Sequence, residues 1–102
     1  MSSGAQYIRH VVVRGRVQGV GFRAFVEYEA LRRGIEGWVR NRRDGTVEAI
    51  FAGPETSVND MIETCRYGPL PAHVDAIDQR DGPEDELKAR APGELFSVLR
   101  TV

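Results

Sequence analysis

The fold is decided by the stretch Gly15-Arg16-Val17-Gln18-Gly19-Val20-Gly21-Phe22-Arg23, which joins a predicted strand to a predicted helix. Its three glycines allow a tight turn whose backbone N–H groups point inward toward one small anion. The start of a helix directly behind the turn adds unpaired N–H groups and the positive end of the helix dipole. In the first helical turn, Arg23 carries a planar guanidinium that can grip an oxyanion. The stretch therefore predicts a site for phosphate or another small anion, formed mostly by backbone.

The segments around this loop alternate between strand and helix patterns. Residues 7–14 are apolar and β-branched, which is typical of a strand, and from residue 22 to residue 33 the apolar positions recur three or four apart, as in a helix. Residues 35–41 and 46–52 have strand character, and Asp44-Gly45 between them predicts a β-hairpin.

A second helix is predicted after the hairpin, with Thr56 or Ser57 as its N-cap and Gly68 just past its end. Its apolar residues recur with helical spacing and form the face that we expect to be buried: Val58, Met61, Ile62 and Cys65.

The remainder of the chain completes a sheet. Residues 73–79 are predicted as a strand in which a bulge would explain the out-of-phase Val74 and Ile77. Residues 82–93 are polar and predicted as a loop, and residues 95–101 as a short final strand. The order β-α-β-β-α-β plus a terminal strand predicts an α+β fold, the ferredoxin-like split βαβ sandwich, with an antiparallel sheet and both helices on one face. We expect a flexible tail at residues 1–6 and a single domain at residues 7–102.

The composition limits the classes of protein to which the chain can belong. Its 102 residues are 41% hydrophobic and carry a net charge of −1, a balance that argues against binding to nucleic acid or to an anionic membrane. The N-terminus lacks the pattern of a signal peptide, and no apolar run approaches membrane length. The single cysteine is compatible with a reducing compartment. We therefore expect a cytoplasmic monomer that binds neither nucleic acid nor membranes.

Few residue types suited to catalysis occur near the glycine loop. The two histidines, His10 and His73, lie in predicted strands, and no cluster of His, Cys and Asp has the spacing of a metal site. Asn41 is the remaining candidate, because in a split βαβ sheet its strand can lie beside the first strand and bring the side chain near the loop. An amide can hold and orient a water, although an Asn before a tight turn is equally typical of ordinary turn chemistry.

An anion site with an arginine and an amide suits one class of reaction. Hydrolysis of an ordinary phosphate ester calls for a general acid or a metal to support the alkoxide that leaves. A mixed carboxylic–phosphoric anhydride instead releases a carboxylate, whose conjugate acid has a pKa of roughly 4 and which departs without protonation. Positioning and charge stabilisation then supply most of the catalysis.

The glycine loop and the segment from Gly37 to Glu48, which reads Gly-Trp-Val-Arg-Asn-Arg-Arg-Asp-Gly-Thr-Val-Glu, together resemble the two signature segments of the acylphosphatase family. The likeness covers about residues 7–77. It implies a metal-independent, cofactor-free enzyme that hydrolyses acyl phosphates to carboxylate and phosphate. By position, Arg23 corresponds to the substrate-binding arginine of the family and Asn41 to its water-positioning asparagine. The phosphate cradle corresponds to Arg16, Val17, Gln18, Gly19, Val20, Gly21 and Phe22.

Two other functions fit parts of the sequence. RNA-recognition modules share the β-α-β-β-α-β order, and residues 21–28 approach their aromatic motif. That motif must lie on the third strand to stack on bases, whereas here it falls on the first helix. The alternative that stays open is a non-catalytic ferredoxin-like domain that binds phosphate or a metabolite.

Overall fold

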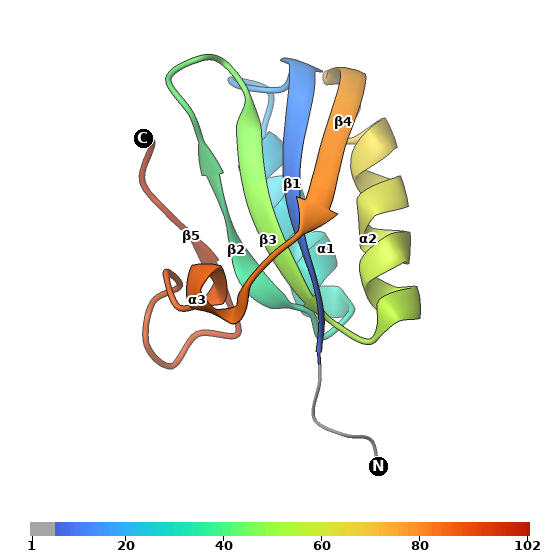
Figure 1. Cartoon of the computed structure of the whole chain (residues 1–102). Helices are drawn as coiled ribbons and strands as arrows, with labels where there is room; N and C mark the ends of the chain where they lie inside the picture. The colour runs from blue at the N-terminus through green and yellow to red at the C-terminus, as the bar shows by residue number, and fades with distance from the viewer. Residues whose placement is uncertain (1–5) are drawn as a thin grey trace.

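The computed structural model describes residues 6–102, so the predicted tail lies, apart from Gln6, outside the described residues. Along the chain the elements are β1 Tyr7–Arg16, α1 Phe22–Arg32, β2 Glu36–Asn41, β3 Val47–Gly53, α2 Glu55–Tyr67, β4 His73–Asp81, α3 Glu84–Leu87 and β5 Phe96–Val98. The strands form one five-stranded sheet in the order β4-β1-β3-β2-β5 (Figure 1). The predicted α+β, ferredoxin-like arrangement is confirmed.

The sheet departs from the prediction in two ways. It is mixed rather than antiparallel, because β5 pairs in parallel with β2, as Gly37 opposite Phe96 and Val39 opposite Val98 show. The chain reverses its direction after β4 and returns to the sheet beside β2. Because β2 runs in the same direction as the returning chain, β5 pairs with it in parallel. In addition, β2 does not lie beside β1: the tight hairpin folds β3 back into the gap between these two strands.

Both long helices cover one face of the sheet, as Figure 1 shows. The main core fills the space between them and the sheet with side chains that include Val11, Val39, Phe51, Val26 and Met61. Within residues 6–102, no helix combines the length and the apolar character needed to cross a membrane.

The second helix buries the residues that its spacing predicts: Val58, Met61, Ile62 and Cys65. The predicted N-cap is wrong, because α2 begins at Glu55 and its N-cap residue is Pro54. The fixed φ of Pro54, here −60°, leads the chain into the helix, and its carbonyl accepts the Val58 N–H at 3.0 Å.

The opposite face of the sheet carries a smaller core. Residues 82–93, predicted as a loop, contain the one-turn helix α3, which lies in front of the sheet in Figure 1. Leu87 of this helix is buried against Ile8, Trp38 and Ile50. The indole N–H of Trp38 donates to the Glu86 carbonyl oxygen at 2.6 Å. The segment therefore covers part of a sheet face that would otherwise expose large apolar side chains.

Where β1 leaves the sheet, β4 carries the predicted bulge. The register shifts between Arg14 and Gly15, opposite Ala76 and Val74, which leaves Asp75 as the extra residue. A Cβ atom at Gly15 would lie 2.3 Å from the His73 carbonyl oxygen, so only glycine permits this close approach. The bulge on β4 thus lies opposite the end of β1, where the glycine loop begins.

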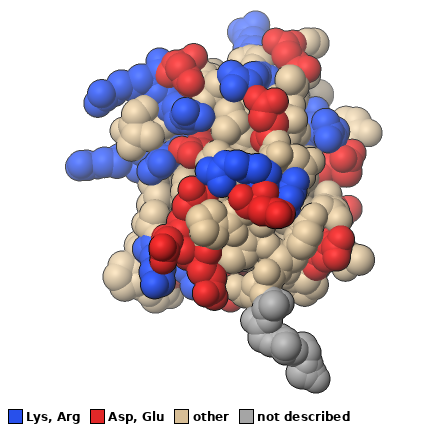
Figure 2. Space-filling model, viewed as in Figure 1, with Lys and Arg blue, Asp and Glu red and all other residues tan. Residues whose placement is uncertain are grey.

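Charged side chains of both signs are interspersed over the face drawn in Figure 2. Several are paired across strands, such as Arg9 with Asp81 and Arg14 with Asp78 at 2.6 Å. Exposed pairs of this kind contribute little to stability, on the order of 0–1 kcal/mol each.

Candidate active site

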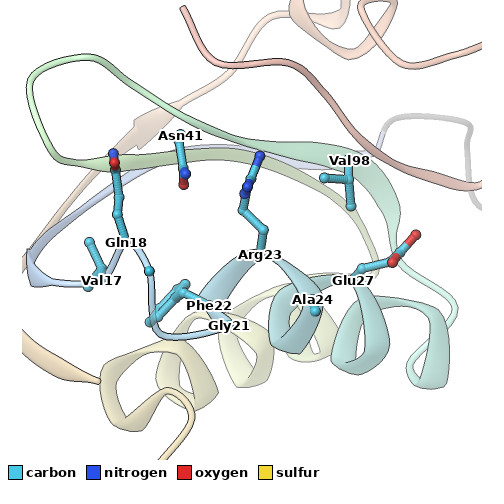
Figure 3. Close-up of a pocket in the computed structure, with 10 residues that line it drawn as sticks. Val17, Gln18, Gly21, Phe22, Arg23, Ala24, Glu27, Asn41 and Val98 are labelled. Atoms are coloured by element: carbon cyan, nitrogen blue, oxygen red, sulfur yellow. The ribbon is translucent and has the colours of Figure 1, made fainter. Parts of the chain in front are cut away.

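A pocket of about 460 Å³ opens between the glycine loop, the start of α1 and the ends of β2 and β5 (Figure 3). Ten residues line it: Val17, Gln18, Gly19, Gly21, Phe22, Arg23, Ala24, Glu27, Asn41 and Val98. The pocket therefore brings Arg23 and Asn41 together with most of the predicted loop. Of the predicted loop residues, Arg16 and Val20 are not part of the lining.

The loop is fixed by its two apolar ends. The side chains of Val17 and Phe22 are each only 1% exposed and belong to the main core. Between them, Gly19 and Gly21 take left-handed backbone conformations with φ of 74° and 81°. Such values cost glycine little, whereas an L side chain is strained there. The burial of Val17 and Phe22 and the left-handed conformations of the two glycines thus fix the loop as a curved segment of backbone at the edge of the core.

The backbone N–H groups of this loop are available to a ligand. Within residues 6–102, none of the N–H groups from Gln18 to Arg23 donates a hydrogen bond. Gly21 is the N-cap residue of α1 and supplies no side-chain cap, so the helix start keeps its positive end uncovered. Free amides at a helix N-terminus form a site for a phosphate-sized anion.

Gln18 ties the loop to the β2–β3 hairpin. Its amide nitrogen donates to the carbonyl oxygens of Arg42 at 2.7 Å and Thr46 at 2.8 Å. Since Arg42 directly follows Asn41, this side chain couples the position of the loop to that of the strand end. Sequence reasoning placed Gln18 in the cradle but did not identify this contact, which joins residues far apart in the chain.

Asn41 directs its carboxamide into the pocket from the end of β2 (Figure 3). Its Oδ1 atom is buried and accepts no hydrogen bond within the described residues. The hairpin turn is instead closed by Asp44, whose carboxylate accepts from the Thr46 N–H at 3.0 Å and from its hydroxyl at 2.6 Å. Ordinary turn chemistry therefore does not account for Asn41, because the turn is stabilised by another residue.

Arg23 extends from the first turn of α1 toward the same space as Asn41 (Figure 3). Its guanidinium forms no ion pair with the carboxylates of residues 6–102. A free guanidinium beside free amides and an unsatisfied carboxamide creates a site that is positive, rich in donors and able to hold one ordered water.

The other reactive side chains lie away from this pocket. His10 is buried on the opposite face of the sheet and pairs with Glu48 at 2.6 Å, and His73 is exposed. Burial raises the pKa of the Cys65 thiol to about 12. Among residues 6–102, no three His, Cys, Asp or Glu side chains are grouped in a way that could hold a metal ion.

Sequence reasoning missed three lining residues: Ala24, Glu27 and Val98. Glu27 follows Arg23 by one helical turn, so helix geometry could have placed it beside the site. For Val98 no such signal exists, because its position depends on the parallel pairing of β5 with β2.

Known proteins are similar to this chain in sequence and in fold. The acylphosphatase family model matches residues 9–90. An acylphosphatase of Rhodopseudomonas palustris (strain BisB18) is 57% identical over 95 residues, which cover 93% of this chain and 96% of the relative. The crystal structure of an acylphosphatase from Bacillus subtilis matches with a TM-score of 0.79 and 35% identity, over 93% of this chain and 99% of that one. An acylphosphatase from Coxiella burnetii matches with a TM-score of 0.79 and 30% identity, over 92% and 93% of the two chains.

The resemblance carried by the two sequence segments is thereby confirmed. The matched region contains the glycine loop, α1 and the strand that ends in Asn41, which supply every residue of the pocket lining except Val98. This chain belongs to the acylphosphatase family.

Proposed function

We propose that this acylphosphatase hydrolyses the bond between the acyl oxygen and the phosphorus of small acyl phosphates, and that Arg23, Asn41 and the loop of residues 16–22 carry the reaction. One observation supports this most directly: a guanidinium, a run of free backbone N–H groups and an unsatisfied carboxamide face one pocket. Each group matches one need of the reaction.

The phosphoryl group binds to the loop and to Arg23. The free N–H groups and the start of α1 hold its oxygens, and Arg23 adds a charge-assisted hydrogen bond. These donors are in place before substrate arrives, because Val17 and Phe22 anchor the loop in the core. Preorganised donors stabilise charge that develops on the phosphoryl oxygens in the transition state.

Asn41 holds the attacking water through Oδ1. As the bond between the water oxygen and phosphorus forms, the bond from phosphorus to the acyl oxygen breaks, and its electron pair stays on the carboxylate. The proton lost by the water passes to phosphate or to solvent. Because a carboxylate leaves without protonation, the step requires no general acid and no Lewis acid at the leaving oxygen.

The proposal also covers setting and assembly. We expect the enzyme to act as a monomer in the cytoplasm on a small-molecule substrate, without cofactor. The buried, unpaired thiol of Cys65 supports a reducing compartment. Sedimentation velocity at micromolar concentration measures the oligomeric state.

The test is hydrolysis of benzoyl phosphate in the presence of EDTA. Arg23→Ala is expected to lower kcat/KM by about 10²–10³ and to weaken inhibition by inorganic phosphate. Asn41→Ala is expected to lower kcat by about 10² or more, because the water is no longer aligned, and to leave phosphate inhibition within about two-fold. Its folded stability should be equal or slightly higher, since the variant removes a buried unsatisfied oxygen.

Arg43→Ala is the charge-matched control, because Arg43 is exposed in the hairpin turn and lies outside the pocket lining. Its kinetics should equal those of the parent. A folded parent that binds phosphate and does not turn over benzoyl phosphate would contradict the proposal and indicate a phosphate-binding domain. Equal loss of phosphate affinity in the Arg23 and Asn41 variants would contradict the division of roles.

A further inference from the structure

The pocket extends beyond the part that a phosphoryl group occupies. Figure 3 shows Arg23 rising through its middle, with Asn41 and Gln18 on one side and Val98 and Glu27 on the other. The loop amides and Asn41 account for the first side. The second side, lined by Ala24, Glu27 and Val98, has no role in holding phosphate or water.

The direction in which water attacks phosphorus indicates which part of the substrate lies on this second side. In a displacement at phosphorus, the attacking and leaving oxygens lie roughly in line on opposite sides of the phosphorus. Water held by Asn41 enters from one side of Arg23, so the acyl oxygen leaves toward the other. The acyl carbon is bonded to that oxygen and therefore lies beside Ala24 and Val98.

We infer that Ala24, Glu27 and Val98 form the acyl subsite, and that it selects uncharged acyl groups over acyl groups that carry a second carboxylate. This inference rests on the proposed function. It adds the chemical class of the acyl group, which the phosphate cradle itself does not discriminate.

The side chains of the subsite support this selectivity. Val98 is 42% exposed although it is apolar, and it presents its isopropyl group to the pocket from the last position of β5. Ala24 adds a methyl group from α1 on the same side. Together they form a small apolar wall against which a flat or aliphatic acyl group buries surface.

Glu27 supplies the discrimination by charge. It lies one turn after Arg23 on α1 and is half-buried at the edge of the pocket. Within residues 6–102, its carboxylate forms no ion pair with Lys, Arg or His, and the guanidinium of Arg23, one turn earlier, is directed toward Asn41. A second carboxylate on the acyl group would meet this charge at close range, where repulsion is strongest.

The experiment compares kcat/KM for acetyl, benzoyl and succinyl phosphate in the parent and in two variants. Glu27→Gln is expected to raise the ratio of succinyl to benzoyl phosphate about three- to five-fold, because one repulsion at close range is removed. Val98→Ala is expected to lower the ratio of benzoyl to acetyl phosphate about three-fold, through loss of apolar contact. Glu55→Gln, an exposed carboxylate at the start of α2, is the matched control and should leave both ratios unchanged.

These ratios isolate the acyl group. The substrates share one phosphoryl group, and the fraction of active enzyme cancels, so partial unfolding of a variant does not alter the result. Unchanged ratios in both variants, with benzoyl phosphate turnover retained, would overturn the subsite and leave the proposed function standing. If the parent hydrolyses none of the three substrates, the proposed function and the subsite both fall.

Discussion

Replacing Gln18 by alanine tests how firmly the phosphate loop is tied to the hairpin. The variant loses two hydrogen bonds, to the carbonyl oxygens of Arg42 at 2.7 Å and Thr46 at 2.8 Å. A typical hydrogen bond contributes about 0.5–1.5 kcal/mol net, so together they are worth about 1–3 kcal/mol. Both carbonyls keep a backbone donor, Gly45 N–H at 3.0 Å and Arg42 N–H at 2.9 Å. Neither becomes unsatisfied, and the expected loss is about 1–2 kcal/mol.

The assay is urea unfolding followed by the fluorescence of Trp38, the single tryptophan, which is 2% exposed in the folded protein. We also expect kcat for benzoyl phosphate to fall about ten-fold, because Asn41 directly precedes one of the two tethered carbonyls. Gln18→Met, which keeps the length of the side chain without a donor, should behave like the alanine variant in both measurements.

Gln79→Ala provides the matched control. This glutamine lies exposed on the edge strand β4, where it accepts a hydrogen bond from Arg9 at 3.2 Å. Its loss should cost less than about 0.5 kcal/mol and leave turnover unchanged. The coupling of the loop to the hairpin is refuted if Gln18→Ala is no more destabilising than Gln79→Ala, or if the Gln18→Ala variant is less stable than the parent while its kcat stays at the parent value.

Two further predictions concern groups outside the pocket. Burial by itself would raise the pKa of Glu48, but hydrogen bonds from His10 and Arg40 outweigh it and hold the pKa below its ordinary value of 4.5. The carboxylate therefore stabilises the fold fully above pH 4.5 and loses this contribution as the pH falls through the lower folded pKa. We expect the free energy of unfolding of Glu48→Gln to be about 1–3 kcal/mol lower than that of the parent at pH 7. In urea titrations this difference should shrink below pH 4.5, and a difference that stays constant with pH would contradict the prediction. Burial raises the pKa of Cys65 to about 12, so native protein should resist iodoacetamide at pH 8 and react only when unfolded in urea, as mass spectrometry would show.

Local patterns predicted the parts of the fold that depend on near neighbours. The hairpin followed from Asp44-Gly45, and the buried face of α2 followed from the helical spacing of its apolar residues. The bulge in β4 followed from the phase of Val74 and Ile77. In each case the pattern that predicts the feature lies within a few neighbouring residues of the chain, which is why the sequence alone is sufficient for the prediction.

Features that depend on distant contacts escaped prediction. Helix α3 has a single turn and one buried apolar residue, Leu87, so it carries no helical period; it is stabilised by packing on the sheet and by the bond from Trp38. The parallel pairing of β5 depends on where the chain returns after α3, which no local pattern encodes.

In the candidate site too, the parts formed by neighbouring residues were predicted and the parts that depend on distant contacts were not. The loop and Arg23 were predicted from residues adjacent in sequence, and the pocket contains both. Asn41 was expected near the loop because β2 was placed beside β1, and that placement is wrong. The loop and Asn41 nevertheless lie close together, and Gln18 spans from the loop to the hairpin turn next to Asn41. The acyl side of the pocket stayed hidden because Val98 reaches it only through the assembled sheet.

The anchoring of the loop by Val17 and Phe22 has a thermodynamic consequence. A loop whose ends are part of the main core cannot open as a local flap, because displacing it would also expose the side chains of Val17 and Phe22. Its opening then approaches the global unfolding of the domain in free energy. Bound phosphate therefore raises the melting temperature of the whole protein. The anion site and the core are consequently constrained together in evolution, since a substitution that weakens the packing of Val17 or Phe22 also disturbs the position of the loop amides.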